Sequence, residues 1–431
     1  MAHISTTPHH RHFAYSWRSW VVVLTAALFF FFEFIQMNMF NAIAPSLIAS
    51  YKVNAAALGN LSAMYFYGNV LFLIPAGILL DRFSTRRLLL TAITTCVICT
   101  YLFAFSSSLE LAGFFRLITG MGSTFCMLSA VRLASRWFPP NKIALVIGLV
   151  VTMAMAGGML AQTPLALMVH AVGWRHAVTI NATLGVFFIV IIALCVRDYP
   201  SSIREAQIEE RQQLKALGFW TSFAMALKNP QNWLAGLFTN FLSFPVIILG
   251  AAWGSLYLMH VHGLSHIQTT NITQMIFLGM IVGSPLMGFI SDKLARRKLP
   301  MILGAILTLL IMLWIILDTH LSIPGLMVLF FLLGLLSGVQ VITYPLIVES
   351  NPRKITTTAE GLTCMLVMSA GLFQPVFGWL IDLTWDGARN HGVPVYTAHN
   401  FQVAIWLLPA VFLVALCLAF FLKETRCASV D

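Results

Sequence analysis

Apolar stretches of about 20 residues follow one another along almost the whole chain. As a helix, each is long enough to cross the ~30 Å hydrocarbon core of a bilayer. VVVLTAALFFFF, Val21 to Phe32, is continuously apolar, whereas a membrane β-barrel would show shorter segments of alternating polarity. With 59% hydrophobic residues, 9% charged residues and a mean hydropathy of +0.86, the 431-residue chain has too little polar surface for a soluble globule. We therefore predict an all-α membrane protein.

The apolar stretches predict twelve transmembrane helices, and the polar segments between them are too short to hold a large soluble domain. An even number of crossings places both ends of the chain on the same side of the membrane. The predicted helices cover approximately residues 18–43, 56–80, 86–106, 110–134, 143–169, 177–196, 231–257, 267–291, 300–318, 323–347, 359–383 and 400–422.

Lysine and arginine are distributed unevenly between the two sides of this topology. Twenty of the 25 lie on the side of the termini, whereas three lie opposite and two fall within predicted helices. Cytoplasmic loops of membrane proteins carry such an excess, so we expect both termini in the cytoplasm. The same topology accounts for the net charge of +10, and no nucleic-acid partner is expected. The five exceptions are Lys52, Arg175 and Arg389 on the opposite side, and Arg116 and Arg132 within helices.

A charged segment occurs twice, half a chain length apart. GILLDRFSTRR covers Gly77 to Arg87 and GFISDKLARRK covers Gly288 to Lys298, so that Asp292 stands 211 residues after Asp81. Such a repeat indicates two duplicated halves, and in transporters the substrate site lies between them near the middle of the bilayer. We therefore divide the chain into an N-terminal tail (1–17), a six-helix bundle (18–196), a cytoplasmic linker (197–230), a second six-helix bundle (231–422) and a C-terminal tail (423–431).

The two charged segments resemble the loop signature G-x-L-x-D-R/K-x-G-R/K-R/K of the major facilitator superfamily. Ser84 and Ala295 stand where the second glycine of that signature is usual. FRLITGMGS, Phe115 to Ser123, is similar to a second motif of the family, in which an arginine precedes G-x-G. The resemblance implies two six-helix halves related by a pseudo-two-fold axis, and transport of a small molecule by alternating access.

The acid in each loop segment suggests a gate. An acid where a helix reaches the cytoplasm can meet the positive N-terminal end of a neighbouring helix, while arginines hold the loop in place. Contacts that form only when the cytoplasmic side is shut would bias a two-state equilibrium. The alternative is that the basic residues only set the topology. The residues assigned to gating are Gly77, Asp81, Arg82, Arg86, Gly288, Asp292, Lys293 and Arg297.

Glu33 and Arg116 are the charged residues that lie deepest in the predicted helices. Glu33 lies ~22 Å from the cytoplasmic start of its helix and Arg116 lies ~9 Å below the opposite boundary, so their levels are nearly equal. An interior charge costs ~2.5 kcal/mol or more unless it is paired or hydrated, so we expect these two to pair. We further expect Glu33 to take up and release the coupling proton under the control of Arg116. The alternative is a permanent ion pair that joins two helices.

Neutral polar side chains near the middle of the helices are the candidates for substrate binding, because they can satisfy a ligand's hydrogen bonds without a fixed charge. Each of them is about as well suited to bonding a neighbouring helix. The ten candidates are Gln36, Asn41, Tyr65, Asn69, Gln162, Asn240, Gln274, Gln340, Tyr344 and Gln374.

A second resemblance favours import over export. LGNLSAMYFYGNVLFLIPAGILLDRF (Leu58 to Phe83) resembles a bacterial branch of the superfamily that includes intraphagosomal transporters for amino acids and nucleosides. Together with the expected proton-coupling role of Glu33, it leads us to expect a proton-coupled symporter in the bacterial inner membrane that imports a small polar organic nutrient such as an amino acid or nucleoside. We expect it to work as a monomer. The alternatives are a proton antiporter that exports a drug or siderophore, and a non-transporting membrane sensor. VTMAMAGGMLAQTP disfavours export, because it lacks the proline that drug antiporters carry before the glycine pair.

Other kinds of chemistry have little support in the sequence. It holds no metal-ligand cluster, nucleophile–base pair or phosphate-binding loop. We therefore expect neither an enzyme nor a bound cofactor or metal.

Overall fold

The computed structural model describes residues 17–199, 219–352 and 356–427. Within these residues, twelve helices are long and apolar enough to cross a membrane, which confirms the predicted all-α architecture. The predicted N-terminal tail before residue 17 and residues 200–218 of the predicted linker lie outside the described residues. The twelve helices run Trp17–Asn38, Ala55–Leu80, Thr85–Phe105, Leu109–Trp137, Leu145–Val172, Trp174–Cys195, Pro230–His262, His266–Leu294, Lys298–Leu317, Ile323–Ser350, Thr358–Leu383 and Ala398–Phe421.

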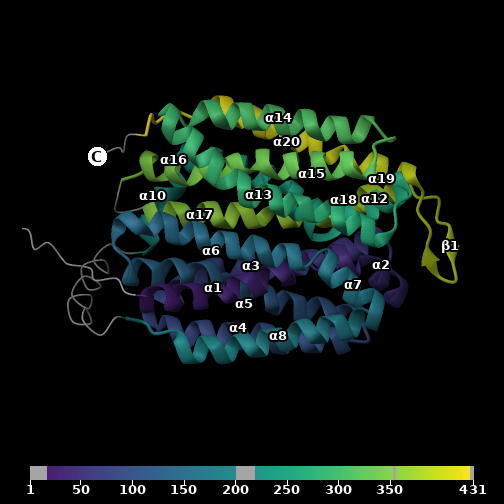
Figure 1. Ribbon diagram of the computed structural model, residues 1–431, viewed down its shortest axis with the longest axis horizontal. Helices are drawn as coiled ribbons and strands as arrows, with labels where there is room; N and C mark the ends of the chain where they lie inside the picture. Colours follow the sequence, from purple (N-terminus) through teal and green to yellow (C-terminus); the bar gives the residue numbers. More distant parts are fainter. Residues whose placement is uncertain (1–16, 200–218, 353–355, 428–431) are drawn as a thin grey trace, which may run out of the picture.

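The helices of the first half of the chain lie together, in purple to teal in the lower part of Figure 1. Several begin with a short polar side chain that accepts a hydrogen bond from the first turn, as Ser84 does from the Arg87 N–H at 3.2 Å. The elements are α1 (Trp17–Asn38), α2 (Phe40–Tyr51), α3 (Ala55–Arg82), α4 (Thr85–Phe105), α5 (Leu109–Trp137), α6 (Pro140–Leu160), α7 (Thr163–Val172) and α8 (Trp174–Cys195).

The second half forms the green to yellow layer above it in Figure 1. It includes one π-helical segment, η1 (Pro245–Trp253), two 3₁₀ segments, η2 (Gly338–Ile342) and η4 (Ser369–Phe373), and a short hairpin of β1 (Arg389–Asn390) and β2 (Val393–Pro394). Its α-helices are α10 (Phe219–Lys228), α11 (Pro230–Leu242), α12 (Gly254–His262), α13 (His266–Leu294), α14 (Lys298–Leu317), α15 (Ile323–Ser337), α16 (Thr343–Ser350), α17 (Thr356–Met368), α18 (Gln374–Leu383), α19 (Ala398–Ile405) and α20 (Leu407–Phe421).

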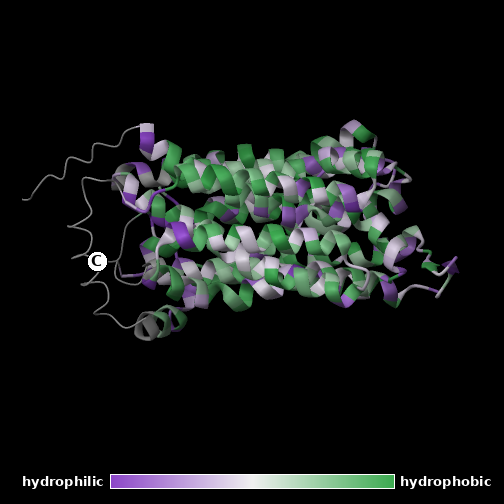
Figure 2. Cartoon of the chain, turned by 90° about the horizontal axis from the view of Figure 1, so that it is seen from below, coloured by the Kyte–Doolittle hydropathy of each residue, from purple (hydrophilic) through white to green (hydrophobic). Residues whose placement is uncertain are grey.

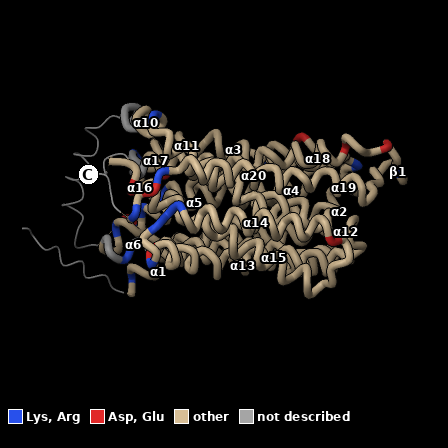
Figure 3. Tube along the Cα trace, turned by 90° about the horizontal axis from the view of Figure 1, so that it is seen from above, with Lys and Arg blue, Asp and Glu red and all other residues tan. Residues whose placement is uncertain are grey.

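The molecule has two ends with different charge. Apolar residues cover the long middle of the helices (Figure 2). Lys and Arg gather at the end that carries the described chain termini, which we call the terminal face (Figure 3). The opposite end carries β1 and β2, and we call it the hairpin face. The helices therefore run between a basic face and a face with little positive charge.

Several membrane helices are interrupted near their middle. The first changes direction between α1 and α2, the fifth breaks at Gln162 between α6 and α7, and the seventh passes through η1. Pro164 and Pro245 lie in the first turn after two of these breaks, where the missing N–H of proline is tolerated. Interrupted helices leave backbone carbonyl groups free, and buried polar side chains bind to them.

Candidate functional site

Glu33 lies on α1 and is buried inside the first half, with 1% of its surface exposed. One carboxylate oxygen, Oε2, accepts a hydrogen bond of 3.3 Å from the hydroxyl group of Tyr65 on α3. The other oxygen, Oε1, is buried without a hydrogen-bond partner. A buried carboxyl group with one unbonded oxygen is suited to binding and releasing a proton, because neither state is locked by a complete set of partners.

Arg116 lies on α5 and is equally buried, with 1% of its surface exposed. Its Nη1 donates a 2.9 Å hydrogen bond to the backbone carbonyl of Gln36, close to the break between α1 and α2. The guanidinium group lies over the rings of Phe40 (4.7 Å) and Tyr65 (5.0 Å). Its Nε and Nη2 have no hydrogen-bond partner. Two nitrogens of this buried guanidinium, Nε and Nη2, are therefore without an acceptor in the protein.

Glu33 and Arg116 do not form the direct ion pair that their equal depth suggested. Among the described residues, the ion pairs within 4.0 Å do not include these two. Tyr65 links them instead, with its hydroxyl group on Glu33 and its ring against Arg116. We call Glu33, Tyr65 and Arg116 the charge cluster.

Glycine brings the helices of the charge cluster together. A Cβ atom at Gly120 of α5 would lie 1.8 Å from the backbone oxygen of Tyr65 on α3, a distance that no side chain allows. The absence of a side chain thus lets the two backbones touch. Because Arg116 lies one helical turn before Gly120, this contact places it against the ring of Tyr65. From the sequence, Tyr65 was predicted to bind substrate, and its linking role was not predicted.

Asn41 and Gln162, both predicted to bind substrate, belong to a buried network that joins the two halves. Asn41 Nδ2 donates to Gln162 Oε1 at 2.6 Å and to Thr273 Oγ1 at 2.9 Å. The Thr273 hydroxyl also donates to Gln162 Oε1 at 2.9 Å, and Gln162 Nε2 donates to the carbonyl of Gly250 at 2.8 Å. The Ser255 N–H completes the set by donating to Asn41 Oδ1 at 2.7 Å. In this arrangement the nitrogen and the oxygen of both amides each have a partner in the protein.

The other predicted substrate-binding residues differ in how completely they are bonded. Four keep a buried polar atom without a partner: Gln36 Nε2, Asn69 Oδ1, Asn240 Oδ1 and Gln374 Oε1. The remaining amide groups of three of these residues bind the protein, Asn69 to Ser123, Asn240 to Leu366 and Ser369, and Gln374 to Ile247. Gln340 contacts the sulfur of Met280 at 3.6 Å, and Gln274 and Tyr344 are partly exposed.

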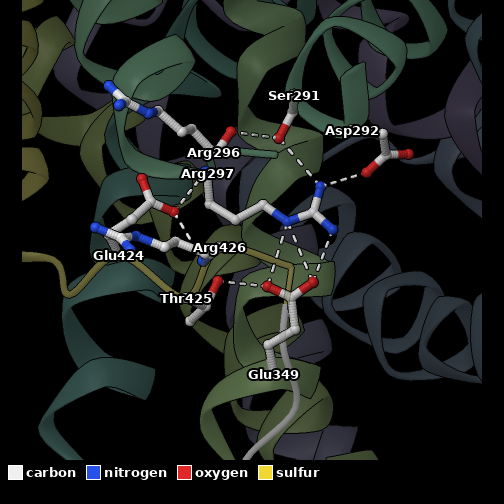
Figure 4. Close-up of polar contacts among 8 residues, drawn as sticks. All are labelled: Ser291, Asp292, Arg296, Arg297, Glu349, Glu424, Thr425 and Arg426. Carbon is white, nitrogen blue, oxygen red and sulfur yellow. Dashed lines mark hydrogen bonds and ion pairs between the residues drawn. The ribbon is translucent and has the colours of Figure 1, made fainter. Parts of the chain in front are cut away.

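The second loop segment forms a cluster of charges at the terminal face (Figure 4). Arg297 donates to Glu349 Oε1 at 2.7 Å and to Asp292 Oδ1 at 2.5 Å. The carboxylate of Glu424 accepts the backbone N–H groups of Arg297 at 2.8 Å and Lys298 at 3.0 Å, at the start of α14. Lys293 is exposed, and a Cβ atom at Gly288 would meet nothing within 4 Å.

In the first loop segment, Asp198 has the position that Glu424 has in the second. Its Oδ1 accepts the Arg86 N–H at 2.8 Å at the start of α4, and its Oδ2 accepts the hydroxyl of Ser84 at 2.5 Å. Both acids follow the last helix of their half. Asp198 and Glu424 were not among the predicted site residues, and their only signal in the sequence is that shared position.

Of the remaining gating candidates of the first segment, Gly77, Arg82 and Arg86 lie in open surroundings. The side chain of Asp81 lies outside the described residues, and Arg82 is exposed. The Arg86 guanidinium donates to the carbonyl of Ala193 at 2.5 Å. A Cβ atom at Gly77 would meet nothing within 4 Å. The charged contacts described here at the terminal face join residues of the same half.

The two loops also replace their usual second glycine in different ways. Ala295 adopts a left-handed backbone with φ of 49°, a conformation that favours glycine. Ser84 has an ordinary φ of −61° and caps α4 instead.

Comparison with known proteins agrees with a twelve-helix transporter. The model of the Major Facilitator Superfamily matches residues 26–375 and 249–429. The chain belongs to this superfamily and is a multi-pass membrane protein, and the family points to a transporter of small molecules rather than to an enzyme. The chain spans about 65% of the length of the first curated relatives that it matches.

Among curated relatives, the chain is 27% identical over 299 residues to the membrane sensor protein UhpC of Salmonella typhimurium, covering 64% of this chain and 65% of that protein. It is 21% identical over 385 residues to the probable galactarate/D-glucarate transporter GudP of Escherichia coli, covering 82% and 84%. Its fold is similar to an inward-facing, occupied bacterial homolog of the human lysosomal transporter Spinster (TM-score 0.74, 18% identity, 93% and 96% covered). It is also similar to a D-xylose-proton symporter (TM-score 0.74, 15% identity, 95% and 99% covered).

Proposed function

We propose that this protein is a proton-coupled symporter that imports a small polar organic nutrient by alternating access. The observation that carries the proposal is the charge cluster, where a lone buried carboxylate is linked through Tyr65 to an arginine with two unbonded N–H groups. Glu33 binds the coupling proton and Arg116 responds to its charge. Loss of the charge on Glu33 changes the electrostatic balance around Arg116, and substrate and proton thereby affect each other's binding.

The substrate we favour carries a carboxylate group. Arg116 Nε and Nη2 are buried without partners, and a guanidinium edge with two N–H groups matches the two oxygens of a carboxylate. GudP is named for galactarate and D-glucarate, which are dicarboxylates, and this supports the choice. We therefore place amino acids and sugar acids before nucleosides.

Neutral polar side chains of the second half bind the rest of the substrate. Asn240 and Gln374 each keep a buried oxygen without a partner, and such oxygens accept hydrogen bonds from hydroxyl or ammonium groups. Asn41 and Gln162 become available only if the network between the halves opens. Gln274, Gln340 and Tyr344 complete the set of candidate ligands in the second half.

The membrane setting follows from the distribution of charge. Lys and Arg gather at the terminal face, so we place this face, with both termini, in the cytoplasm of a bacterial inner membrane. The two predicted bundles, 18–196 and 231–422, then move against each other as a monomer, and the eight gating residues of the two loop segments control the cytoplasmic side.

Substrate-dependent proton flux in proteoliposomes tests the proposal. The purified protein is reconstituted with the pH-sensitive dye pyranine inside, and amino acids, sugar acids, nucleosides and carboxylated chelators are added outside. We expect a carboxylate-bearing compound to acidify the lumen and to accumulate under an inward proton gradient. Expulsion under that gradient would identify an antiporter, and binding without flux would identify a sensor, the function for which UhpC is named.

A further inference from the structure

At the hairpin face, the first turn of α3 is bound by residues of the opposite half. The Ala55 N–H donates to the hydroxyl oxygen of Tyr396 at 2.7 Å and to Asp382 Oδ1 at 3.3 Å. The Ala56 N–H donates to Asp382 Oδ2 at 2.8 Å. The first N–H groups of a helix lack partners within the helix and carry its positive end. Asp382 therefore supplies α3 with a charged cap from the other half.

Asp382 and Tyr396 form a unit within the second half. The Tyr396 hydroxyl donates to Asp382 Oδ1 at 2.6 Å, and its ring packs against Trp385 and Phe401. Trp385 in turn donates to the carbonyl of Val395 at 3.0 Å, across the segment that contains the hairpin. The cap can thus stay assembled when it leaves α3, and among the bonds described for Asp382 and Tyr396, those to Ala55 and Ala56 cross between the halves.

The backbones of α3 and α18 touch next to the bonds between Asp382 and the first turn of α3. A Cβ atom at Gly59 of α3 would lie 2.6 Å from the carbonyl oxygen of Gln374, and one at Gly378 of α18 would lie 2.4 Å from that of Ala55. The glycines allow the two backbones to approach this closely, and the bonds from Ala55 and Ala56 to the cap form only at this short separation. A small separation of the halves therefore breaks these bonds. Capping and closure at this face therefore occur together.

We propose that Asp382, positioned by Tyr396, is a removable latch that holds the hairpin face closed by capping α3. Asp382 lies in the last turn of its own helix, where a negative charge is unfavourable, so its stabilising interaction is with α3. Asp81, for which the sequence predicts a gate, stands near the other end of α3, toward the terminal face. With Asp382, α3 has a predicted gate at each of its two ends.

Double electron–electron resonance of the full-length protein in nanodiscs tests the latch. Spin labels on Glu110→Cys and His320→Cys, exposed at the hairpin face of the two halves, report the separation of the halves. Asp382→Ala should increase the ratio of open to closed populations about fivefold to tenfold. Tyr396→Phe should shift it in the same direction. Cysteines 195, 364, 417 and 427, which are not fully buried, are replaced by serine.

The matched control is Asp386→Ala, because Asp386 bonds only within its own half, to the N–H of Ala388 at 3.0 Å. This control should keep the wild-type distance distribution. Wild-type distributions for both Asp382→Ala and Tyr396→Phe would overturn the latch, and if Asp382→Ala does not fold, Tyr396→Phe alone decides. The measurement uses neither substrate nor gradient, so its result is independent of the proposed proton-coupled import.

Discussion

The hydroxyl group of Tyr65 lies 3.3 Å from a carboxylate oxygen of Glu33, and the ring of the same tyrosine supports the guanidinium group of Arg116. One side chain thus touches both charged groups of the charge cluster. The charge of Glu33 can therefore influence Arg116 electrostatically without a direct ion pair. The two groups can also separate without a large rearrangement.

Glu33→Gln separates proton coupling from substrate movement. Glutamine keeps the size and one oxygen acceptor of the side chain but cannot be deprotonated. We expect gradient-driven accumulation to fall to the level of empty liposomes, whereas exchange of labelled for unlabelled substrate continues, because exchange needs no net proton movement. Uptake and exchange in the same proteoliposomes measure both.

Glu110→Gln is the matched control for this prediction. Glu110 lies in the first turn of α5, as an exposed acid at the hairpin face. It should behave as the wild type in both assays. Normal accumulation by Glu33→Gln would remove Glu33 from the coupling mechanism.

Tyr65→Phe tests the link within the charge cluster. The substitution keeps the ring against Arg116 and removes the hydroxyl group that bonds Glu33. A hydrogen bond to a charged group contributes roughly 1.5 kcal/mol or more, so we expect proton-driven uptake to slow about tenfold or more. Substrate affinity should change little, because the guanidinium keeps its support, whereas Tyr65→Leu should weaken both.

Initial uptake rates across substrate concentrations measure these effects as changes in kcat and KM. Tyr101→Phe is the control, since Tyr101 bonds Thr183 at 2.8 Å on an exposed part of α4. If Tyr65→Phe transports at the wild-type rate, the hydroxyl contact does not contribute to coupling.

The fold and the depth of the charge cluster follow from simple regularities of the sequence. Hydropathy alone indicates the twelve helices, because the bilayer requires long apolar segments. The constant rise per residue of a helix predicts that Glu33 and Arg116 lie at nearly equal levels, and in the structure both contact Tyr65. It could not show that Tyr65 lies between them, because the rotation of each helix depends on packing such as that of Gly120 against Tyr65.

The hydrogen-bond partners of the polar residues could not be predicted from the sequence for a different reason. Asn41 bonds Thr273, which lies 232 residues away in the chain and in the other half. Hydropathy identifies Asn41 as a polar residue in an apolar helix, but carries no information on which distant residue meets it. Asp198 and Glu424 are ordinary polar-segment acids in the sequence, and only the return of each half's last helix to the start of α4 or α14 reveals their role.

Glu349→Gln tests whether the terminal-face cluster is held by its buried pair. The side chains of Arg297 and Glu349 are only 7% and 11% exposed, and removing Glu349's charge leaves the buried guanidinium with only Asp292, whose side chain is 69% exposed, as a charged partner. We expect a loss of roughly 3 kcal/mol in unfolding free energy, seen as a lower Tm in tryptophan fluorescence.

Asp292→Asn is the comparison variant. Asp292 lies at 2.5 Å from Arg297, but its side chain is 69% exposed, so water screens the pair. We expect a loss of less than about 1 kcal/mol. Equal losses for the two variants would mean that burial does not determine the strength of this cluster.

Glu424 gives the terminal face a specific dependence on pH. Burial alone would raise its pKa, but hydrogen bonds from the backbone N–H groups of Arg297, Arg426 and Lys298 outweigh burial and lower the pKa below the ordinary value of 4.5. A carboxyl group with a lowered pKa in the folded state stabilises that state above its unfolded pKa, and this stabilisation disappears as the pH falls through the folded pKa.

We therefore expect the Tm difference between the wild type and Glu424→Gln to be constant from about pH 7 to about pH 5 and to shrink progressively below about pH 4.5. Glutamine can accept a backbone N–H through one oxygen only, so the variant should be the less stable of the two at neutral pH. Thermal unfolding of both proteins in the same detergent across this range measures the difference. A difference that stayed constant down to about pH 3 would show that the charge of Glu424 does not stabilise the start of α14.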